Sequence, residues 1–193
     1  MVFSSNQNFE GFISIDCGAE EDYLDRNTGI TYKTDKDFIS TGKNTVVEPE
    51  FYLTIPYFGD MVNSLRTFPE GKRNCYTLKP RQGKNQNYYV RAFFYYGNYD
   101  SKNQAQKFDL YIGVNYWETV DVRQQTYYSI IHYSVTDTIY VCLVNTGSGV
   151  PFINGLDLRF MNDSPYRSMN GSLLPRVHAD LGGNPTQSSS TIR

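Results

Sequence analysis

The segment KFDLYIGVN, residues 107–115, shows the clearest alternation of apolar and polar side chains in the chain. Phe108, Leu110, Ile112 and Val114 fall on one side of an extended backbone, and mostly polar side chains fall between them. Because successive side chains of a strand point to opposite faces of a sheet, this pattern predicts a strand with one buried face. We therefore expect these four apolar side chains to point into a core.

Four other segments predict strands by the same reasoning. Residues 11–18, 88–96 and 153–160 alternate, and TIYVCLVN at 138–145 is apolar on both faces, which is typical of a central strand. Turn signals separate the segments: Pro69-Glu70-Gly71, Pro80 through Gly83, Gly97-Asn98 and Asn145-Thr146-Gly147. Short strands at this spacing predict an all-β fold, an antiparallel β-sandwich or jelly roll.

The composition excludes several classes of partner. The chain of 193 residues has 18 basic and 20 acidic residues and a net charge of −2, with no basic stripe that could follow a nucleic-acid backbone. No apolar run approaches the roughly 20 residues of a membrane helix, and the first residues do not form a signal peptide. We expect neither nucleic-acid binding nor membrane contact by this fragment itself.

Of the three cysteines, Cys17 and Cys142 lie in the strands predicted above, and Cys75 lies in a further short predicted strand between the turns at Pro69-Glu70-Gly71 and Pro80 through Gly83. They are too far apart in sequence to resemble a zinc site, and His132 and His178 add no ligand spacing, so we expect no metal and no cofactor. Either all three are buried thiols, or one disulfide forms and leaves one thiol; three pairings are then open.

Two glycosylation sequons, at Asn162 and Asn170, follow the last predicted long strand. Together with the cysteines they favour a secreted protein.

Several charged residues also carry predictions. Lys33, Asp35, Lys36 and Asp37 are expected to form a salt-bridged surface turn. Arg91 and Arg159 alternate outward and are expected either to pair with acids or to bind a partner. The expected inward strand positions hold no pair of carboxylates of the kind that glycoside hydrolysis needs, and no nucleophile motif is present. We therefore expect no enzyme activity.

Longer motifs carry a family resemblance. RNCYTL at 73–78, YGNYD at 96–100, FDLYIGV at 108–114 and CLVNTGSGVPFI at 142–153 follow one another in an order that resembles the malectin-like extracellular region of plant leucine-rich-repeat receptor-like kinases. The resemblance implies a carbohydrate-binding-module-like β-sandwich outside the plasma membrane, with Cys75 in a disulfide that helps to hold the sandwich together. Such receptors usually carry two tandem malectin-like subdomains, followed by leucine-rich repeats, a membrane helix and a kinase.

The resemblance also divides the chain. Residues 1–8 are expected to be a disordered leader, residues 9–166 the malectin-like domain, and residues 167–193 a flexible linker. Asp180-Leu181-Gly182 echoes Asp16-Cys17-Gly18, which would place the start of a truncated second subdomain inside that last segment.

A ligand site follows from comparison with animal malectin, a lectin for a glucose disaccharide. The loop before its FD strand supplies two adjacent aromatics, and matching FD to Phe108-Asp109 places Tyr99 and Asp100 there. A later malectin aspartate is replaced by Ser148 or Gly149, so the sugar site is only partly kept. The sequence predicts an aromatic cleft whose residues are Tyr32, Tyr99, Asp100, Tyr116 and Trp117.

Two functions compete on these grounds. The first is a non-catalytic recognition module of a receptor, binding an oligosaccharide of the cell wall, a peptide or a co-receptor ectodomain. The alternative is a structural or protein–protein interaction module that binds no sugar. The cleft hypothesis requires Tyr99 and Trp117 to lie at the same end of the sandwich, and a sugar site would be concave, whereas an interaction module would present a flat apolar patch.

Overall fold

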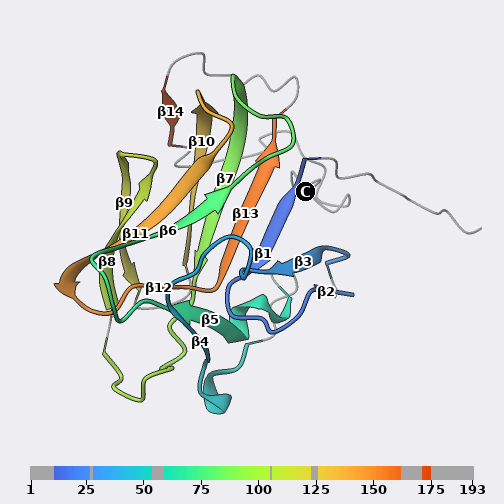
Figure 1. The fold of residues 1–193 in the computed structure, drawn as a ribbon. Helices are drawn as coiled ribbons and strands as arrows, with labels where there is room; N and C mark the ends of the chain where they lie inside the picture. The colour runs from blue at the N-terminus through green and yellow to red at the C-terminus, as the bar shows by residue number, and fades with distance from the viewer. Residues whose placement is uncertain are drawn as a thin grey trace, which may run out of the picture.

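The computed structural model describes residues 11–26, 28–53, 59–104, 106–122, 126–161 and 171–174, and in these parts it is built almost entirely of strands (Figure 1). In chain order the elements are β1 (Ile13–Asp16), β2 (Tyr23–Leu24), β3 (Thr31–Thr34), β4 (Lys43–Val46), η1 (Pro49–Phe51), η2 (Asp60–Asn63), β5 (Ser64–Thr67), β6 (Arg73–Leu78), β7 (Gln86–Phe94), β8 (Gln106–Ile112), β9 (Asn115–Val122), β10 (Thr126–Ser134), β11 (Ile139–Ser148), β12 (Phe152–Ile153), β13 (Gly155–Phe160) and β14 (Ser172–Leu173). The labels η1 and η2 denote short 3-10 helices.

The strands form three sheets, and the two larger ones pack face to face, so the predicted β-sandwich is confirmed (Figure 1). The seven-stranded sheet has the order β14-β10-β7-β13-β1-β3-β2, and the four-stranded sheet has the order β6-β11-β8-β9. A three-stranded sheet, β12-β5-β4, lies below them in the view of Figure 1. Strand pairs in the described parts of the chain are antiparallel with one exception, the parallel pairing of β1 with β3.

The core between the large sheets follows the predicted alternation. Phe108, Leu110 and Ile112 of β8 are buried, and the ring of Phe108 lies 5.7 Å from that of Phe94 on β7. Val114 is an exception, because its side chain is 88% exposed. It follows Gly113, whose φ of +57° belongs to the tight turn between β8 and β9, so the expectation that Val114 faces inward is wrong.

Strand β11 is central, as its apolar faces predict, because it pairs with β6 on one side and β8 on the other. The expected turn at Asn145-Thr146-Gly147 is wrong, since these residues lie inside β11. They form an irregularity where the pairing with β8 shifts between Val144 and Ser148. The side chain of Asn145 accepts a hydrogen bond from Gly147 N–H at 2.8 Å, so the turn signal bends the strand without ending it.

A second, smaller cluster covers the outer face of β7. Phe93 packs there with Tyr32, Met61 and Val62, which come from β3 and η2. Strand β7 is therefore buried on both faces over part of its length. The sheet also continues beyond the domain end expected at residue 166, because β14 pairs with β10. The division into leader, domain and linker stays a prediction.

Candidate functional site

The five residues of the predicted aromatic cleft do not come together. Trp117 is 2% exposed and belongs to the main core, while Tyr32 is 1% exposed and belongs to the second cluster. Alternation along β9 explains the position of Trp117, because Tyr116 points outward and the next side chain must point inward. Neither ring presents a face to solvent.

Tyr99 and Trp117 lie toward opposite ends of β8. Tyr99 belongs to the loop that precedes Gln106, the first residue of β8, whereas Trp117 lies close to the β8–β9 turn, where Ile112 pairs with Asn115 (Figure 1). The expectation that they share one end is wrong, and a single cleft formed by all five residues is excluded. Ligand binding by any one of the five stays a prediction.

The loop between β7 and β8 nevertheless gathers aromatic and polar groups. The ring of Tyr99 lies 5.3 Å from Tyr96 and 5.5 Å from Phe152, and the hydroxyl of Tyr96 donates a hydrogen bond to Asp100. The Tyr99 hydroxyl is buried and has no hydrogen-bond partner among the residues that the structure describes. Burial raises the pKa of the Tyr99 hydroxyl, which therefore stays neutral.

Tyr116 lies on the outer face of the four-stranded sheet. Its side chain is 53% exposed, and its ring meets that of Tyr111 edge-on at 5.7 Å. The guanidinium of Arg73 lies 4.9 Å from the centre of the Tyr111 ring. This part of the molecule is an exposed sheet face and not a cleft.

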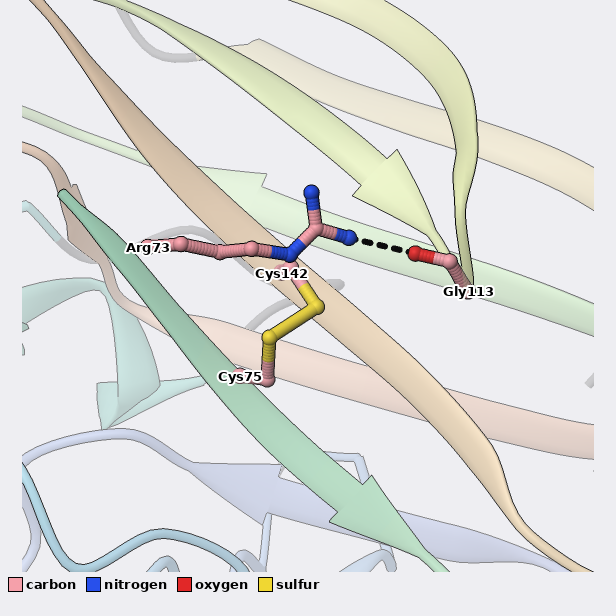
Figure 2. Close-up of a disulfide and its surroundings, with 4 residues drawn as sticks. All are labelled: Arg73, Cys75, Gly113 and Cys142. Atoms are coloured by element: carbon pink, nitrogen blue, oxygen red, sulfur yellow. Dashed lines mark hydrogen bonds between the residues drawn. A yellow bond between two sulfur atoms is a disulfide. The ribbon is translucent and has the colours of Figure 1, made fainter.

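The disulfide joins Cys75 of β6 to Cys142 of β11, which are directly opposite one another in the pairing of these strands (Figure 2). It therefore cross-links two neighbouring strands of one sheet of the sandwich. The side chain of Arg73 crosses β11 beside the disulfide and donates to the carbonyl of Gly113 (Figure 2). Cys17 is a free, buried thiol.

A polar network lies inside the molecule, where the sequence predicted a surface turn. Asp35 is 0% exposed, and Arg66 Nε and Nη2 donate to its two carboxylate oxygens at 2.5 and 2.6 Å. The hydroxyl of Tyr76 donates to the same carboxylate at 2.9 Å. The hydrogen bonds to Asp35 raise the pKa of Arg66, so the guanidinium stays charged. The expectation that Asp35 belongs to a surface turn is wrong, because its salt bridge is buried and is made with Arg66.

Strand positions also hold carboxylates that were not expected there. Asp16 of β1 is 3% exposed and accepts hydrogen bonds from Ser64 Oγ at 2.6 Å and the Tyr23 hydroxyl at 2.7 Å. Burial raises the pKa of the Asp16 carboxyl to about 6. The two hydrogen bonds lower this pKa, but their effect is smaller than that of burial. Asp157 of β13 is buried as well.

Asp157 pairs with the two arginines that were expected to find acids. Arg91 Nη2 lies 2.6 Å and Arg159 Nη2 lies 3.1 Å from its carboxylate oxygens, so that expectation is confirmed. Thus Asp16, Asp35 and Asp157 each have protein partners and none faces a cleft.

Two adjoining hollows lie beside β6. One, of about 450 Å³, is lined by Ser40, Thr41, Gly42, Lys43, Pro69, Glu70, Gly71 and Asn74. The second, of about 390 Å³, is lined by Lys36, Asp37, Phe38, Ile39, Ser40, Thr41, Arg73, Asn74, Cys75 and Thr77. We call them together the β6 trough. Sequence periodicity could not reveal this trough, because it depends on how the segment 36–43 lies against β6.

Both glycosylation sequons lie partly or wholly outside the residues that the structure describes. Asn162 and Asn170 are outside the described residues, but Ser172 of the second sequon lies in β14, where its hydroxyl is 2.9 Å from His132 Nδ1. Within the described parts of the chain, no helix is long and apolar enough to cross a membrane, and no group of three potential ligand side chains could hold a metal ion.

Sequence relatives are plant receptor kinases. The chain is 41% identical over 186 residues to the LRR receptor-like serine/threonine-protein kinase IOS1 of Arabidopsis thaliana, covering 94% of this chain and 20% of the relative. It is 43% identical over 173 residues to the receptor-like protein kinase At3g21340 of the same plant, covering 86% of this chain and 19% of the relative. The chain thus spans about a fifth of the length of these relatives.

Solved structures share the fold. The ectodomain of ANX1 from Arabidopsis thaliana superposes with a TM-score of 0.64 at 14% identity, covering 78% of this chain and 41% of that one. The plant receptor-like kinase FER gives a TM-score of 0.63 at 16% identity, covering 81% and 43%. A family model described as the malectin-like domain matches residues 15–192, which is most of the chain. The chain therefore belongs to the malectin-like domain family.

Proposed function

We propose that this domain is a non-catalytic, extracellular recognition module of a plant receptor-like kinase, and that its partner is a peptide or a co-receptor ectodomain. One observation carries the choice of partner. Trp117 and Tyr32, two rings of the predicted sugar cleft, are buried in the two cores, whereas the β6 trough is concave and lined by polar and charged as well as apolar side chains. Polypeptides bind to such open, polar surfaces through main-chain and side-chain hydrogen bonds.

The relatives support the receptor context. IOS1 is a receptor-like kinase, which places a malectin-like segment in a protein with a kinase. A structure of FER contains the plant peptide RALF23 and LLG2, and it superposes on this chain with a TM-score of 0.58 at 16% identity, covering 79% of this chain and 40% of that one. That complex belongs to FER, and it supports a polypeptide as the class of partner.

The absence of catalysis is part of the proposal. Asp35 is held by Arg66, Asp157 by two arginines, and Asp16 by Ser64 and Tyr23. A carboxylate committed to such partners inside the protein cannot act as acid or nucleophile on a bound sugar, which needs two carboxyl groups facing one cleft.

A second candidate function is glycan binding at the β7–β8 loop. The buried Tyr99 hydroxyl, which has no partner among the described residues, favours it, because a ligand hydroxyl could supply the missing hydrogen bond. Asp100 and Tyr96 lie beside it. A purely structural role, in which the domain orients a neighbouring domain, is the alternative to both.

The test is a parallel binding measurement on the secreted, disulfide-bonded domain. An oligosaccharide array of plant cell-wall glycans and a panel of secreted plant peptides and co-receptor ectodomains are presented to the wild type and to Tyr99→Phe. We expect saturable binding to a polypeptide that Tyr99→Phe leaves unchanged. Saturable glycan binding that Tyr99→Phe removes would instead establish the second function, and binding to neither group would leave the structural role.

A further inference from the structure

The free edge of β6 presents main-chain hydrogen-bonding groups to the β6 trough. Among the described strands, β6 pairs only with β11, and on its other side Thr77 N–H donates to the carbonyl of Phe38 at 2.8 Å. Main-chain groups point the same way at every second residue of a strand. The N–H and C=O of Cys75, and the N–H of Arg73, therefore also point away from β11.

The groups of Cys75 find no partner on that side among the described residues. Among the described residues, the one main-chain hydrogen bond between segment 36–41 and β6 is that from Thr77 to Phe38, and the chain then continues through Ser40 and Thr41 toward β4. Both residues line the trough together with Cys75, so the space beside the Cys75 main chain is open. The segment 36–41 thus pairs with β6 at Thr77 and leaves the edge of β6 beside Cys75 and Arg73 unpaired.

The edge is also held rigid. Cys75 is bonded to Cys142 on the neighbouring strand, and Arg73 reaches across β11 to the carbonyl of Gly113 (Figure 2). A preformed edge loses little conformational freedom when it binds, which favours affinity per hydrogen bond.

We propose that the β6 edge takes an extended segment of a partner polypeptide, which adds a strand beside residues 73–75 and fills the trough as far as Ser40 and Thr41. This inference rests on the proposed function and locates its peptide site. The groups without a partner are main-chain N–H and C=O groups that recur at every second residue of β6. The main chain of another extended segment has donors and acceptors at the same spacing and can pair with them.

The trough walls support this occupant. Lys36 and Lys43 are offset by Asp37 and Glu70. The guanidinium of Arg73 is held over Tyr111 by its bond to the Gly113 carbonyl, so charge in the trough does not select a polyanion. The larger hollow has no aromatic ring in its lining, and Phe38, the one ring in the lining of the second, packs against the main core. A sugar ring would need an open aromatic face for its apolar side.

The probe is a displayed library of random twelve-residue peptides, selected on the oxidised, secreted domain. Amide hydrogen exchange is then measured with and without the selected peptides. We expect exchange of the Cys75 amide to slow at least tenfold, because its N–H becomes hydrogen-bonded. Peptides that protect only another edge, such as β9, would overturn the inference and leave peptide recognition standing. A library without any binder would overturn both.

Two variants isolate the main chain. Arg73→Pro removes the outward N–H and costs no ladder bond, since that N–H points away from β11. Arg73→Ala is its control, because it removes the same side chain and keeps the N–H. We expect Arg73→Pro to bind the selected peptides about tenfold more weakly than Arg73→Ala, the effect of one main-chain hydrogen bond.

A third variant tests the trough without touching β6. Ser40→Trp places a large ring in the trough from an exposed position, and Val135→Trp places the same ring on an exposed residue that lines neither hollow. We expect Ser40→Trp to abolish binding of the selected peptides and Val135→Trp to leave it unchanged. Equal binding by both would overturn the proposal, even if Arg73→Pro failed to fold.

Discussion

The molecule has two interiors of opposite character. Between the large sheets, aromatic rings meet edge to face, with Phe94 at 5.7 Å from Phe108 and 6.2 Å from Phe152. Near β1, β3, β5 and β6, charged and hydroxyl groups are buried instead, with Asp35 and Arg66 as the central pair. We call the first the apolar core and the second the polar interior.

The difference teaches how each region is stabilised. The apolar core gains free energy from the area removed from water, so each residue contributes nearly independently of its partners' identities. In the polar interior every buried polar group depends on a specific hydrogen-bond partner. When one partner is removed, the remaining group stays buried without a hydrogen bond, and the protein bears the full cost of its desolvation. A single substitution should therefore lower stability through lost apolar burial in the apolar core, and through an unpaired buried polar group in the polar interior.

The largest expected effect is in the polar interior. Asp35→Ala would leave the Arg66 guanidinium buried without its carboxylate, and we expect a loss of about 4–5 kcal/mol of unfolding free energy. Denaturant titration of the folded domain measures it. The double variant Asp35→Ala, Arg66→Met should recover most of the loss, because it removes both charges; if it did not, the pair would be acting by packing alone.

Phe108→Ala tests the apolar core. Removing a fully buried ring should cost about 4 kcal/mol through lost burial and the cavity left behind. The same titration applies, with Phe108→Leu as a control that retains most of the volume and should cost far less. In contrast to the polar interior, no second substitution at one partner should restore the loss, and a full rescue of that kind would contradict the comparison.

Asp16 should make stability fall as pH rises. Its pKa is raised from 3.8 to about 6 in the folded protein, so between these values the folded state keeps a proton that the unfolded state has released. The contribution is fully present below about pH 4 and lost above about pH 6. The expected total is about 3 kcal/mol, because a tenfold change in a proton-binding constant corresponds to roughly 1.4 kcal/mol.

Urea unfolding at pH 4, 5, 6 and 7 measures this dependence. Asp16→Asn keeps the shape of the side chain and cannot titrate, so its stability curve should lack the fall and lie above the wild type at pH 7. Parallel pH curves for wild type and variant would show that the Asp16 carboxyl does not carry the effect.

The smallest effect is expected where a polar atom lies at the margin of the apolar core. Tyr99→Phe removes a buried hydroxyl that has no partner among the described residues, while its ring contacts with Tyr96 and Phe152 remain. Stability should rise by about 1 kcal/mol, seen as a higher midpoint in thermal unfolding. Tyr76→Phe is the matched control, because the Tyr76 hydroxyl donates to Asp35 and its loss should destabilise.

Much of the apolar core could be predicted from the sequence. Phe108, Leu110 and Ile112 repeat with the period of a strand, and the two apolar faces of 138–145 indicate a strand between two others. Such periodicity is local, because it follows from the geometry of one extended segment. It failed at Val114, where a glycine turn interrupts the strand.

The polar interior and the candidate site could not be predicted in this way. Asp35 and its neighbours look like a surface turn until Arg66, 31 positions away, is placed against them. The sequence predicted Trp117 in an open aromatic cleft, but its position in β9 directs the side chain into the core. The signal available in the sequence was that Tyr116 and Trp117 must point to opposite faces if both lie in one strand.

By itself, the sequence determined the strands β1, β7, β8, β11 and β13, the all-β class and the malectin-like family, because alternation and contiguous motifs are properties of short segments. Only the tertiary structure decided that Cys75 bonds to Cys142, that Asp16 and Asp35 are buried, and that the concave surface runs beside β6. Each of these depends on which distant strands become neighbours. That choice is made by the packing of whole faces, which no single segment contains.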